Sequence, residues 1–287
     1  PPILTPWPPF SMIHLFGISD GLDSLASIPA GITFTIRNLE VRNGYIPNGN
    51  GGSSFVFVAT GGHLNMTDVV VRDMVTLSLG GAAIYAALPT SSSSLTRVDF
   101  IDCSALSGGS SAIVLQAPTA WSLEDVTFQN CSYNAVTDIS YYAMMVTTAN
   151  SNAYVTMSGA ISFSTPYLST FPGVLLQGLG TNTGTLTILT NISNPAYWSF
   201  TRLSAVQFRP GSSGLAKIRF EASSLTFTDT TVGYAFTSSD TNPVEIYVDQ
   251  SVTFATIGIF STSTSPVLFA SGGTISSSAC LQNNVFT

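Results

Sequence analysis

Hydrophobic and polar positions alternate along this chain in a pattern that recurs at nearly constant intervals. Each occurrence reads apolar, any residue, apolar, any residue, and then Asn or Asp. The four occurrences lie at 39–43, 69–73, 98–102 and 126–130, so that their starts are 30, 29 and 28 residues apart. Because residues two apart share one face of a strand, each occurrence predicts a short β-strand with one apolar side.

A second motif keeps the same interval. Paired glycines followed by small and apolar residues lie at 51–55, 80–84 and 108–113, at steps of 29 and 28 residues. Two unrelated motifs with one period indicate a repeated structural unit, and periods of this length are typical of solenoids. A unit of about 29 residues holds two or three short strands at ~3.3 Å per residue. The sequence therefore predicts an all-β parallel β-helix, with equivalent strands ~4.8 Å apart in successive coils.

The same register predicts which side chains form the interior. Val41, Val71, Phe100 and Phe128 hold the same position in the four occurrences and should stack as one file inside the helix. The Asn or Asp that ends each occurrence forms a second file, which consists of Asn43, Asp73, Asp102 and Asn130. We expect these four to face inwards at a turn and to form a ladder of side-chain hydrogen bonds, with at least one Asp tilted towards the turn backbone or solvent. The plainer alternative is that they only end the strands.

The pattern divides the chain into regions. Residues 31–287 are predicted to form the β-helix, with regular coils over 32–140 and irregular coils over 141–287. A separate β domain that begins near 145–175 is the alternative for the second half. Residues 1–30 start with a proline-rich segment that contains Pro1, Pro2, Pro6, Pro8 and Pro9. Such a segment is extended, and we expect a linker or a cap over the first coil.

The repeats resemble a known family. Val-Thr-Phe-Gln-Asn-Cys at 126–131 together with Gly-Gly-Ala-Ala-Ile at 80–84 is similar to the repeats of polymorphic outer membrane proteins, which form pectin-lyase-like right-handed β-helices. The resemblance covers residues 32–140, and Val41 and Val71 depart from it because the family has Phe there. It implies a right-handed coil and a structural or adhesive role at a cell surface. The same type of helix also carries polysaccharide lyases and hydrolases.

Composition narrows the expected partners and location. Only 8% of the residues are charged, against about 25% in ordinary soluble domains. The 8 basic and 15 acidic residues give a net charge of −7, which argues against nucleic acid or an anionic membrane as partner. A surface of Gly, Ser, Thr and Asn suits an extracellular or cell-surface protein that packs against other subunits or carries glycans. No apolar run is long enough to predict a membrane span.

Cysteines and sequons add details to this expectation. Cys103 and Cys131 follow the ladder positions in adjacent coils, so that either a disulfide or two buried thiols fits the spacing. Cys280 is left over and could pair with another chain. Sequons start at Asn65, Asn130 and Asn191. Asn130 should face inwards and carry no sugar, which leaves Asn65 and Asn191 as candidate N-glycosylation sites.

Candidate catalytic groups are few. In the predicted register, Arg97 shares a column with Asp125, and Asp99 lies in the next one. One outward face could therefore form a groove with Asp99 and Asp125 as acids and Arg97 between them, as polysaccharide cleavage requires. The alternative is an exposed strand ladder in which Asp68, Arg97 and Asp125 alternate in sign and form ion pairs across strands. His14 and His63 have no triad partners at any recognisable spacing. Trp121, Trp198, Tyr142 and Tyr197 could form a sugar-binding platform together with Tyr141, or they could simply pack.

These observations favour one function over another. We expect an extracellular structural or adhesive β-helix, a scaffold or building block of a surface filament, appendage or coat, without catalytic residues, cofactor or metal. The alternative is a carbohydrate-active enzyme of the pectin-lyase-like fold. A face that binds ice or a mineral would need a flat array of threonines, and the sequence shows only isolated threonine pairs.

Overall fold

The chain folds into a parallel β-solenoid, seen here in a computed structural model. The structure describes residues 11–14, 24, 26–46, 53–76, 81–87, 92–105, 110–131, 133–134, 139–140, 142–148, 152–166, 172–178, 184–209, 217–228, 236–238, 244–254, 260–261, 267–271, 274–276, 281–282 and 284–286. Within these ranges every regular element is a strand, and none is a helix. The all-β class and the solenoid predicted from the repeat are therefore confirmed. The proline-rich segment 1–10 and Cys280 lie outside the described residues.

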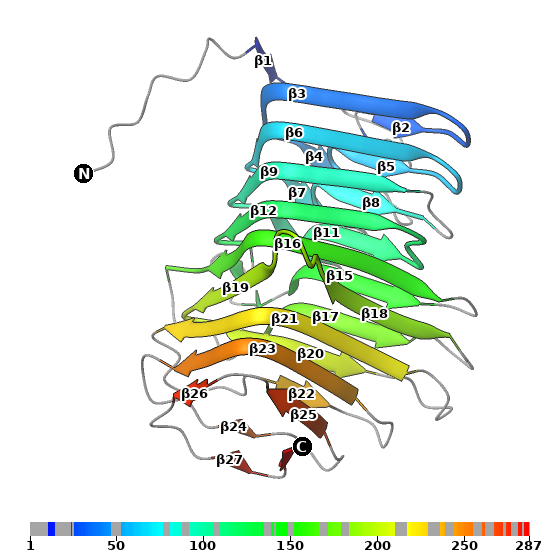
Figure 1. Cartoon of the computed structure of the whole chain (residues 1–287). Helices are drawn as coiled ribbons and strands as arrows, with labels where there is room; N and C mark the ends of the chain where they lie inside the picture. The colour runs from blue at the N-terminus through cyan, green and yellow to red at the C-terminus, as the bar shows by residue number, and fades with distance from the viewer. Residues whose placement is uncertain are drawn as a thin grey trace.

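One large parallel sheet, called sheet A, runs the length of the solenoid at the front of Figure 1. Its strands are β1 (Ser11–His14), β3 (Thr33–Arg42), β6 (His63–Arg72), β9 (Ser93–Ile101), β12 (Trp121–Gln129), β16 (Ala153–Ser164), β18 (Thr185–Thr190), β19 (Ala196–Thr201), β21 (Lys217–Thr228), β23 (Val244–Phe254), β25 (Val267–Ser271), β26 (Thr274–Ser276) and β28 (Asn284–Phe286). Each strand pairs in parallel with its equivalent in the next coil, as the repeat predicts.

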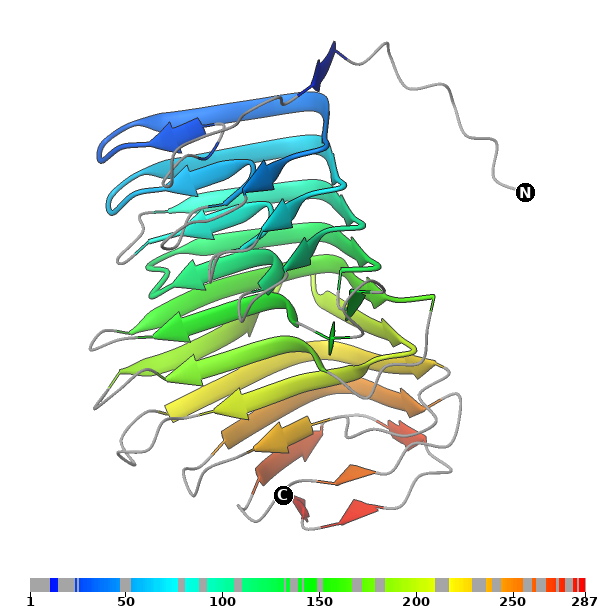
Figure 2. The same ribbon diagram turned by 180° about the vertical axis from the view of Figure 1, so that it is seen from behind.

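A second parallel sheet, sheet B, forms the opposite wall (Figure 2). It consists of β2 (Ala26–Ile28), β5 (Val56–Val58), β8 (Ile84–Ala86), β11 (Ser110–Gln116), β15 (Tyr142–Thr148), β17 (Pro172–Gly178), β20 (Ser204–Arg209) and β22 (Phe236–Ser238). The short sheet C joins β4 (Tyr45–Ile46), β7 (Val75–Thr76) and β10 (Ser104–Ala105). Two small pairs complete the list, antiparallel β13 (Tyr133–Asn134) with β14 (Ile139–Ser140) and parallel β24 (Phe260–Ser261) with β27 (Leu281–Gln282).

The coils wind to the right. Sheet A strands run from right to left across the front of Figure 1, and sheet B strands run back behind them, as the arrows of Figure 2 show. Seen from the N-terminal end, the chain thus turns clockwise as it moves away. This is the hand that nearly all parallel crossover connections take.

The interior is built from side-chain files that pass from coil to coil. Val41 is aligned with Val71, Val71 with Phe100, and Phe100 with Phe128, and all four are 0–1% exposed, as predicted. The file continues as Phe163, Phe200 and Phe227. Ring centroids of successive phenylalanines lie 5.2, 4.6, 5.1 and 5.5 Å apart with interplanar angles of 7–12°. The rings are therefore stacked along the solenoid axis, which is the arrangement that identical residues at one register position produce.

The same sheet passes from the regular coils into the later ones. The strand β16 pairs with β12 on one side and with both β18 and β19 on the other. Next, β21 pairs with β18 and β19 and then with β23. The interval between equivalent residues changes because the number of residues between strands varies, while the register of the inward positions is kept. Sheets A and B both continue beyond β16 and β17, so that the later strands belong to the same solenoid.

Five successive strands of sheet A, β3, β6, β9, β12 and β16, are each bent by a residue in the left-handed backbone region. The bend residues are Asn38 (φ 51°), Asp68 (φ 55°), Arg97 (φ 52°), Asp125 (φ 51°) and Gly159 (φ 63°), one for each of five successive coils. A second left-handed residue follows the strand in the first four of these coils, at Asn43, Asp73, Asp102 and Asn130, with φ of 52–63°. Asn and Asp tolerate this region better than other residues with a Cβ, which explains why they recur at these two positions.

The phenylalanine file predicts where the fold is most sensitive. Phe128 stacks between Phe100 and Phe163. The variant Phe128→Ala should lower the free energy of unfolding by about 3–5 kcal/mol, because a cavity opens between two coils. The adjacent outward position offers a control, since Thr127→Ala should change stability by about 0.5 kcal/mol or less. Chemical denaturation of both variants measures this. Equal effects would contradict the assigned faces of β12.

A side chain at Gly159 should be tolerated less well than one at Gly31. A Cβ at Gly159 would overlap Asp125 Oδ1, on a backbone that already has φ +63°. Gly31 has a similar φ of +74° and nothing within 4 Å of the same position, so that Gly31→Ala carries only the backbone strain, about 1 kcal/mol. Gly159→Ala should lower the melting temperature more than Gly31→Ala. A smaller loss at Gly159 would contradict the close approach of Asp125.

Candidate functional site: the outer face of sheet A

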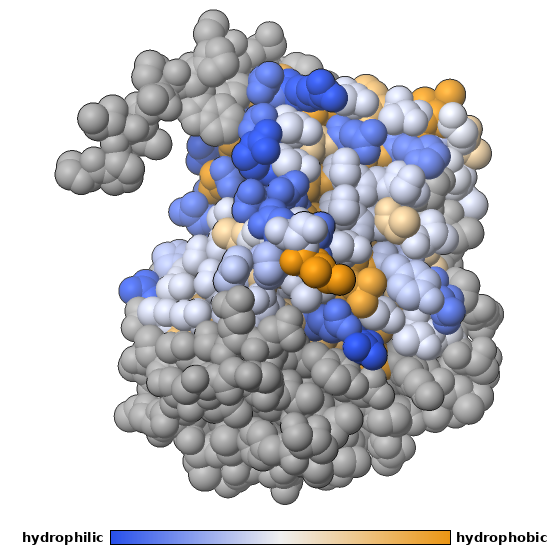
Figure 3. Space-filling model, in the orientation of Figure 1, coloured by the Kyte–Doolittle hydropathy of each residue, from blue (hydrophilic) through white to orange (hydrophobic). Residues whose placement is uncertain are grey.

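Side chains that point away from the core form straight columns on the outer face of sheet A. The strands alternate buried and partly exposed residues, as in the pattern of β6 and β9. One column runs Thr35, Asn65, Ser94, Ser122 and Thr156 through the first five of these coils. Ser94 Oγ donates to Asn65 Oδ1 at 2.9 Å, so that these two members of the column are hydrogen-bonded to each other. Figure 3 looks directly at this face.

Charged side chains gather on the N-terminal part of the face, where Figure 3 shows a strongly hydrophilic band. Arg97 Nε and Nη2 donate to the two carboxylate oxygens of Asp68, at 2.6 and 2.9 Å. The hydrogen bonds from Arg97 hold the pKa of Asp68 below its ordinary value. Both partners are partly exposed, at 28% for Asp68 and 52% for Arg97, so solvent screens the pair. These charges are therefore satisfied within the face.

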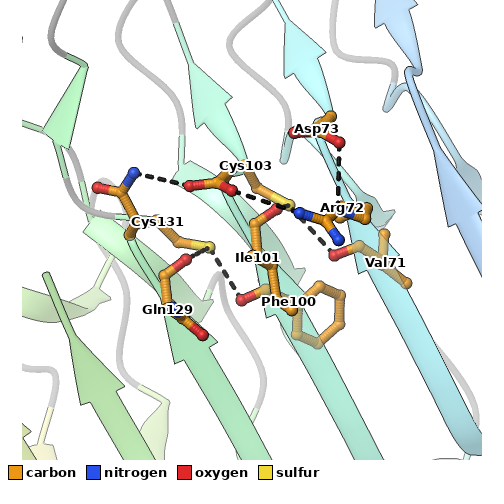
Figure 4. Close-up of polar contacts among 10 residues, drawn as sticks. Val71, Arg72, Asp73, Phe100, Ile101, Cys103, Gln129 and Cys131 are labelled. Atoms are coloured by element: carbon orange, nitrogen blue, oxygen red, sulfur yellow. Dashed lines mark hydrogen bonds and ion pairs between the residues drawn. The ribbon is translucent and has the colours of Figure 1, made fainter.

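The predicted ladder lies at a corner of the solenoid and faces outwards. Asn130 Nδ2 donates to Asp102 Oδ1 at 2.7 Å, and Arg72 lies 3.2 Å from Asp73 and 3.9 Å from Asp102 (Figure 4). Asp73 and Asp102 are 43% and 42% exposed, and Asn43 is exposed as well. The expectation that this file faces inwards was wrong for Asn43, Asp73 and Asp102. The expected hydrogen bond between side chains of adjacent coils is present from Asn130 to Asp102. A left-handed residue at the corner turns its side chain away from the core and brings the next residue inwards.

The residues that follow the corner are the buried ones. Cys103 and Cys131 lie on adjacent coils, both 0% exposed, and Figure 4 shows them side by side. Both are free thiols, so of the two alternatives the structure has the buried pair and not the disulfide. Cys131 Sγ donates to the carbonyl oxygens of Phe100 and Gln129, each at 3.3 Å. Burial raises the pKa of the Cys131 thiol well above its ordinary value, which keeps it protonated and unreactive.

Hydroxyl columns cover the later part of the face, and sequence reasoning missed them. Ser162 aligns with Ser199 and Thr226, and two residues further on Ser164 aligns with Thr201 and Thr228. Each member flanks a buried phenylalanine in a Ser-Phe-Ser, Ser-Phe-Thr or Thr-Phe-Thr triplet. The triplets start 37 and then 27 residues apart. This break in period hid the columns, although the triplet itself was a readable signal.

The two acids proposed for catalysis have different surroundings. Asp125 is the bend residue of β12, and its Oδ1 accepts a hydrogen bond from the backbone N–H of Ala160 at 2.8 Å. Asp99 lies in β9 between Val70 and Thr127 of the adjacent strands. Arg97, expected between the acids, pairs with Asp68. Asp125 therefore supports the backbone of the next coil. The Arg97–Asp68 pair is one of the cross-strand charge pairs that the alternative expected.

The aromatic and histidine residues considered as candidates for binding or catalysis are mostly buried or hydrogen-bonded within the fold. Trp121 and Trp198 are 1% exposed and Tyr142 is 6% exposed, so that of the two alternatives these three residues pack in the interior. Tyr197 is 44% exposed, and Tyr141 and the side chain of His14 lie outside the described residues. His63 Nδ1 lies 2.7 Å from the carbonyl oxygen of Ser92. Among the described side chains no group of three or more His, Cys, Asp or Glu could hold a metal ion, and the described residues hold no helix that could cross a membrane.

The three sequons differ in their surroundings. Asn65 is half-buried in the middle of β6, with Met66 in the core. Asn130 belongs to the corner ladder, and Cys131 after it is buried. Asn191 lies in an exposed loop between β18 and β19.

The chain matches no family model, no curated protein and no solved structure. The parallel β-solenoid that the repeat resemblance implied is present. Membership of the polymorphic outer membrane proteins gains no support from these comparisons.

The Asp68–Arg97 pair predicts a pH dependence. Since the pKa of Asp68 is lowered in the folded protein, the pair stabilises the fold at pH above the ordinary Asp pKa of about 3.9, and this contribution is lost as the pH falls through the lowered value. In Arg97→Gln, the Asp68 pKa measured by NMR titration should rise. Arg72→Gln removes a different arginine and should leave the pKa of Asp68 unchanged. An Asp68 pKa that is insensitive to Arg97→Gln would contradict the pair.

Proposed function

We propose that this protein is an extracellular structural or adhesive β-solenoid whose outer face of sheet A is its contact surface. The observation that carries the proposal is the alignment of polar side chains across successive coils on this face, above all the hydroxyl columns Ser162–Ser199–Thr226 and Ser164–Thr201–Thr228. Parallel strands place successive members ~4.8 Å apart. A surface of this kind offers a partner a repeated set of hydrogen-bond donors and acceptors.

The physical chemistry of the face suits contact with another protein subunit. A single hydrogen bond contributes only about 0.5–1.5 kcal/mol to an interaction. One hydroxyl group therefore binds a partner weakly, whereas the hydroxyl groups of several aligned coils can bind the same partner together. The charges on the N-terminal part of the face pair among themselves, as Arg97 with Asp68 and Arg72 with Asp73. With only 8% charged residues in the chain, electrostatic repulsion between copies is weak. These features support a scaffold or a building block of a surface filament or coat, with other copies or a surface partner bound to this face.

The extracellular assignment rests on the sequence. A Ser-, Thr-, Asn- and Gly-rich composition with few charges suits a protein surrounded by other surface molecules, and an exposed sequon at Asn191 agrees with it. The carbohydrate-active alternative depends on Asp99 and Asp125. Because Asp125 is engaged with the backbone of Ala160, the geometry gives this alternative less support.

A sedimentation experiment tests the contact surface. The purified chain should associate with rising concentration, and the double change Ser199→Lys with Thr201→Lys should reduce the associated fraction at least tenfold, because two lysines break both columns and repel a copy. Ser27→Lys provides a control, since Ser27 is exposed on sheet B. Circular dichroism should show that both variants remain folded.

Two results would contradict the proposal. The first is a chain that stays monomeric at every concentration. The second is a double variant that associates as the unaltered chain does. Release of oligosaccharides from pectin or alginate, lost in Asp99→Asn, would favour the enzymatic alternative instead.

A further inference from the structure

A five-residue loop replaces the single bend residue in one coil of sheet A. In the preceding coils, one left-handed residue separates the two halves of the strand, for example Asp125 in β12. In this coil β18 ends at Thr190 and β19 begins at Ala196, and both halves remain paired with β16. Residues 191–195 therefore leave the sheet. Asn191, Ile192 and Ser193 are exposed, and Ile192 reaches 95% exposure.

Hydrogen bonds at both ends hold this loop in a defined shape. The backbone N–H of Asn191 donates to the carbonyl oxygen of Met157 at 2.9 Å, and the N–H of Ala196 donates to Thr190 Oγ1 at 2.8 Å. Asn194 Nδ2 donates to Glu124 Oε1, two coils back, at 2.9 Å. The loop is thus tied to the sheet while its first three residues project from the face.

The Asn191 side chain closes a turn with its carbonyl group. Asn191 Oδ1 accepts the backbone N–H groups of Ser193 at 2.9 Å and of Asn194 at 3.3 Å, which is an Asx turn. Asn191 Nδ2 donates no hydrogen bond to any described residue. A hydrogen bond to the carbonyl oxygen polarises the amide, and Ser193 supplies the hydroxyl of the N-x-[ST] sequence on the same turn.

We propose that Asn191 is a site of N-linked glycosylation and that the sequons at Asn65 and Asn130 stay unmodified. The donor is a lipid-pyrophosphate-linked oligosaccharide that begins with N-acetylglucosamine. A bond forms between Asn191 Nδ2 and the anomeric carbon of this sugar, and the bond from that carbon to the pyrophosphate oxygen breaks. The lipid pyrophosphate leaves with the electron pair, and one amide proton passes to a base of the transferring enzyme.

The asparagines of the other two sequons make hydrogen bonds to neighbouring coils. Asn130 Nδ2, the atom that would carry the sugar, donates to Asp102 Oδ1 in the corner ladder. Asn65 Oδ1 accepts from Ser94 Oγ in a column whose neighbouring strands lie ~4.8 Å away on both sides. A glycan at Asn65 would lie against these strands, and one at Asn130 would break the ladder. At Asn191 the loop apex leaves space for it.

This inference rests on the proposed extracellular location, because a protein meets the oligosaccharide donor in a secretory pathway. The experiment tests glycosylation of Asn191 separately from that location. The 287-residue chain is fused to an added secretion signal and produced in eukaryotic cells. Its entry into the secretory pathway then does not depend on where the native protein resides. The product should run one glycan heavier than the deglycosylated form. Peptide N-glycosidase should remove the difference, and peptide mass spectrometry should place the glycan at residue 191.

Matched variants decide the assignment. Asn191→Gln and Ser193→Ala should each abolish the mass shift, whereas Asn65→Gln and Asn130→Gln should keep it. A secreted product without sugar at Asn191, or with sugar at Asn65 or Asn130, would overturn the inference. Either result would leave the contact-surface proposal intact, since the sedimentation experiment tests that proposal through Ser199 and Thr201 and does not depend on a glycan.

Discussion

Every coil of this solenoid must bury the same register positions against the coil before it and the coil after it. The file from Val41 to Phe227 is the clearest expression of this constraint, because each member contacts its own equivalents and is almost completely buried. Hydrophobic burial of this kind sets the register of a strand, since a slip of one residue would bring polar side chains into the core. The order of the outer face follows from the order of the interior. Side chains on the outer face are aligned because the phenylalanines on the inner side of the same strands are aligned.

The left-handed residues are the second requirement of the same geometry. A flat strand cannot enclose a core, and each coil therefore turns at fixed places, at Asp68 and Asp73 in one coil and at Asp125 and Asn130 in another. Carboxylate and amide side chains placed there also form contacts between coils, as Asp125 with Ala160 and Asn130 with Asp102. Polar residues at the corners thus combine a backbone role with a link between neighbouring coils.

Much of the fold could be predicted from the sequence, because period and alternation are properties of the chain itself. Strand faces, parallel pairing and the file Val41–Val71–Phe100–Phe128 followed from them. The direction of Asn43 and its equivalents did not, because one left-handed residue exchanges inward and outward positions and leaves no mark on the alternation. The hydroxyl columns at Ser199 and Thr201 were missed for a different reason, since an insertion moved them out of period while the three-dimensional register stayed intact. The free thiols of Cys103 and Cys131 were one of two outcomes that the spacing allowed.

The coil that contains Asn191 shows what the architecture tolerates. Strand β16 keeps its pairing with the chain on both sides of the interruption, so that additional residues at the bend are absorbed without disturbing the packing behind them. Equivalent bends at Asn38, Asp68 and Arg97 in the earlier coils have the same geometry. The bend between β18 and β19 thus marks a position on the outer face of sheet A at which evolution or an engineer could display a foreign peptide.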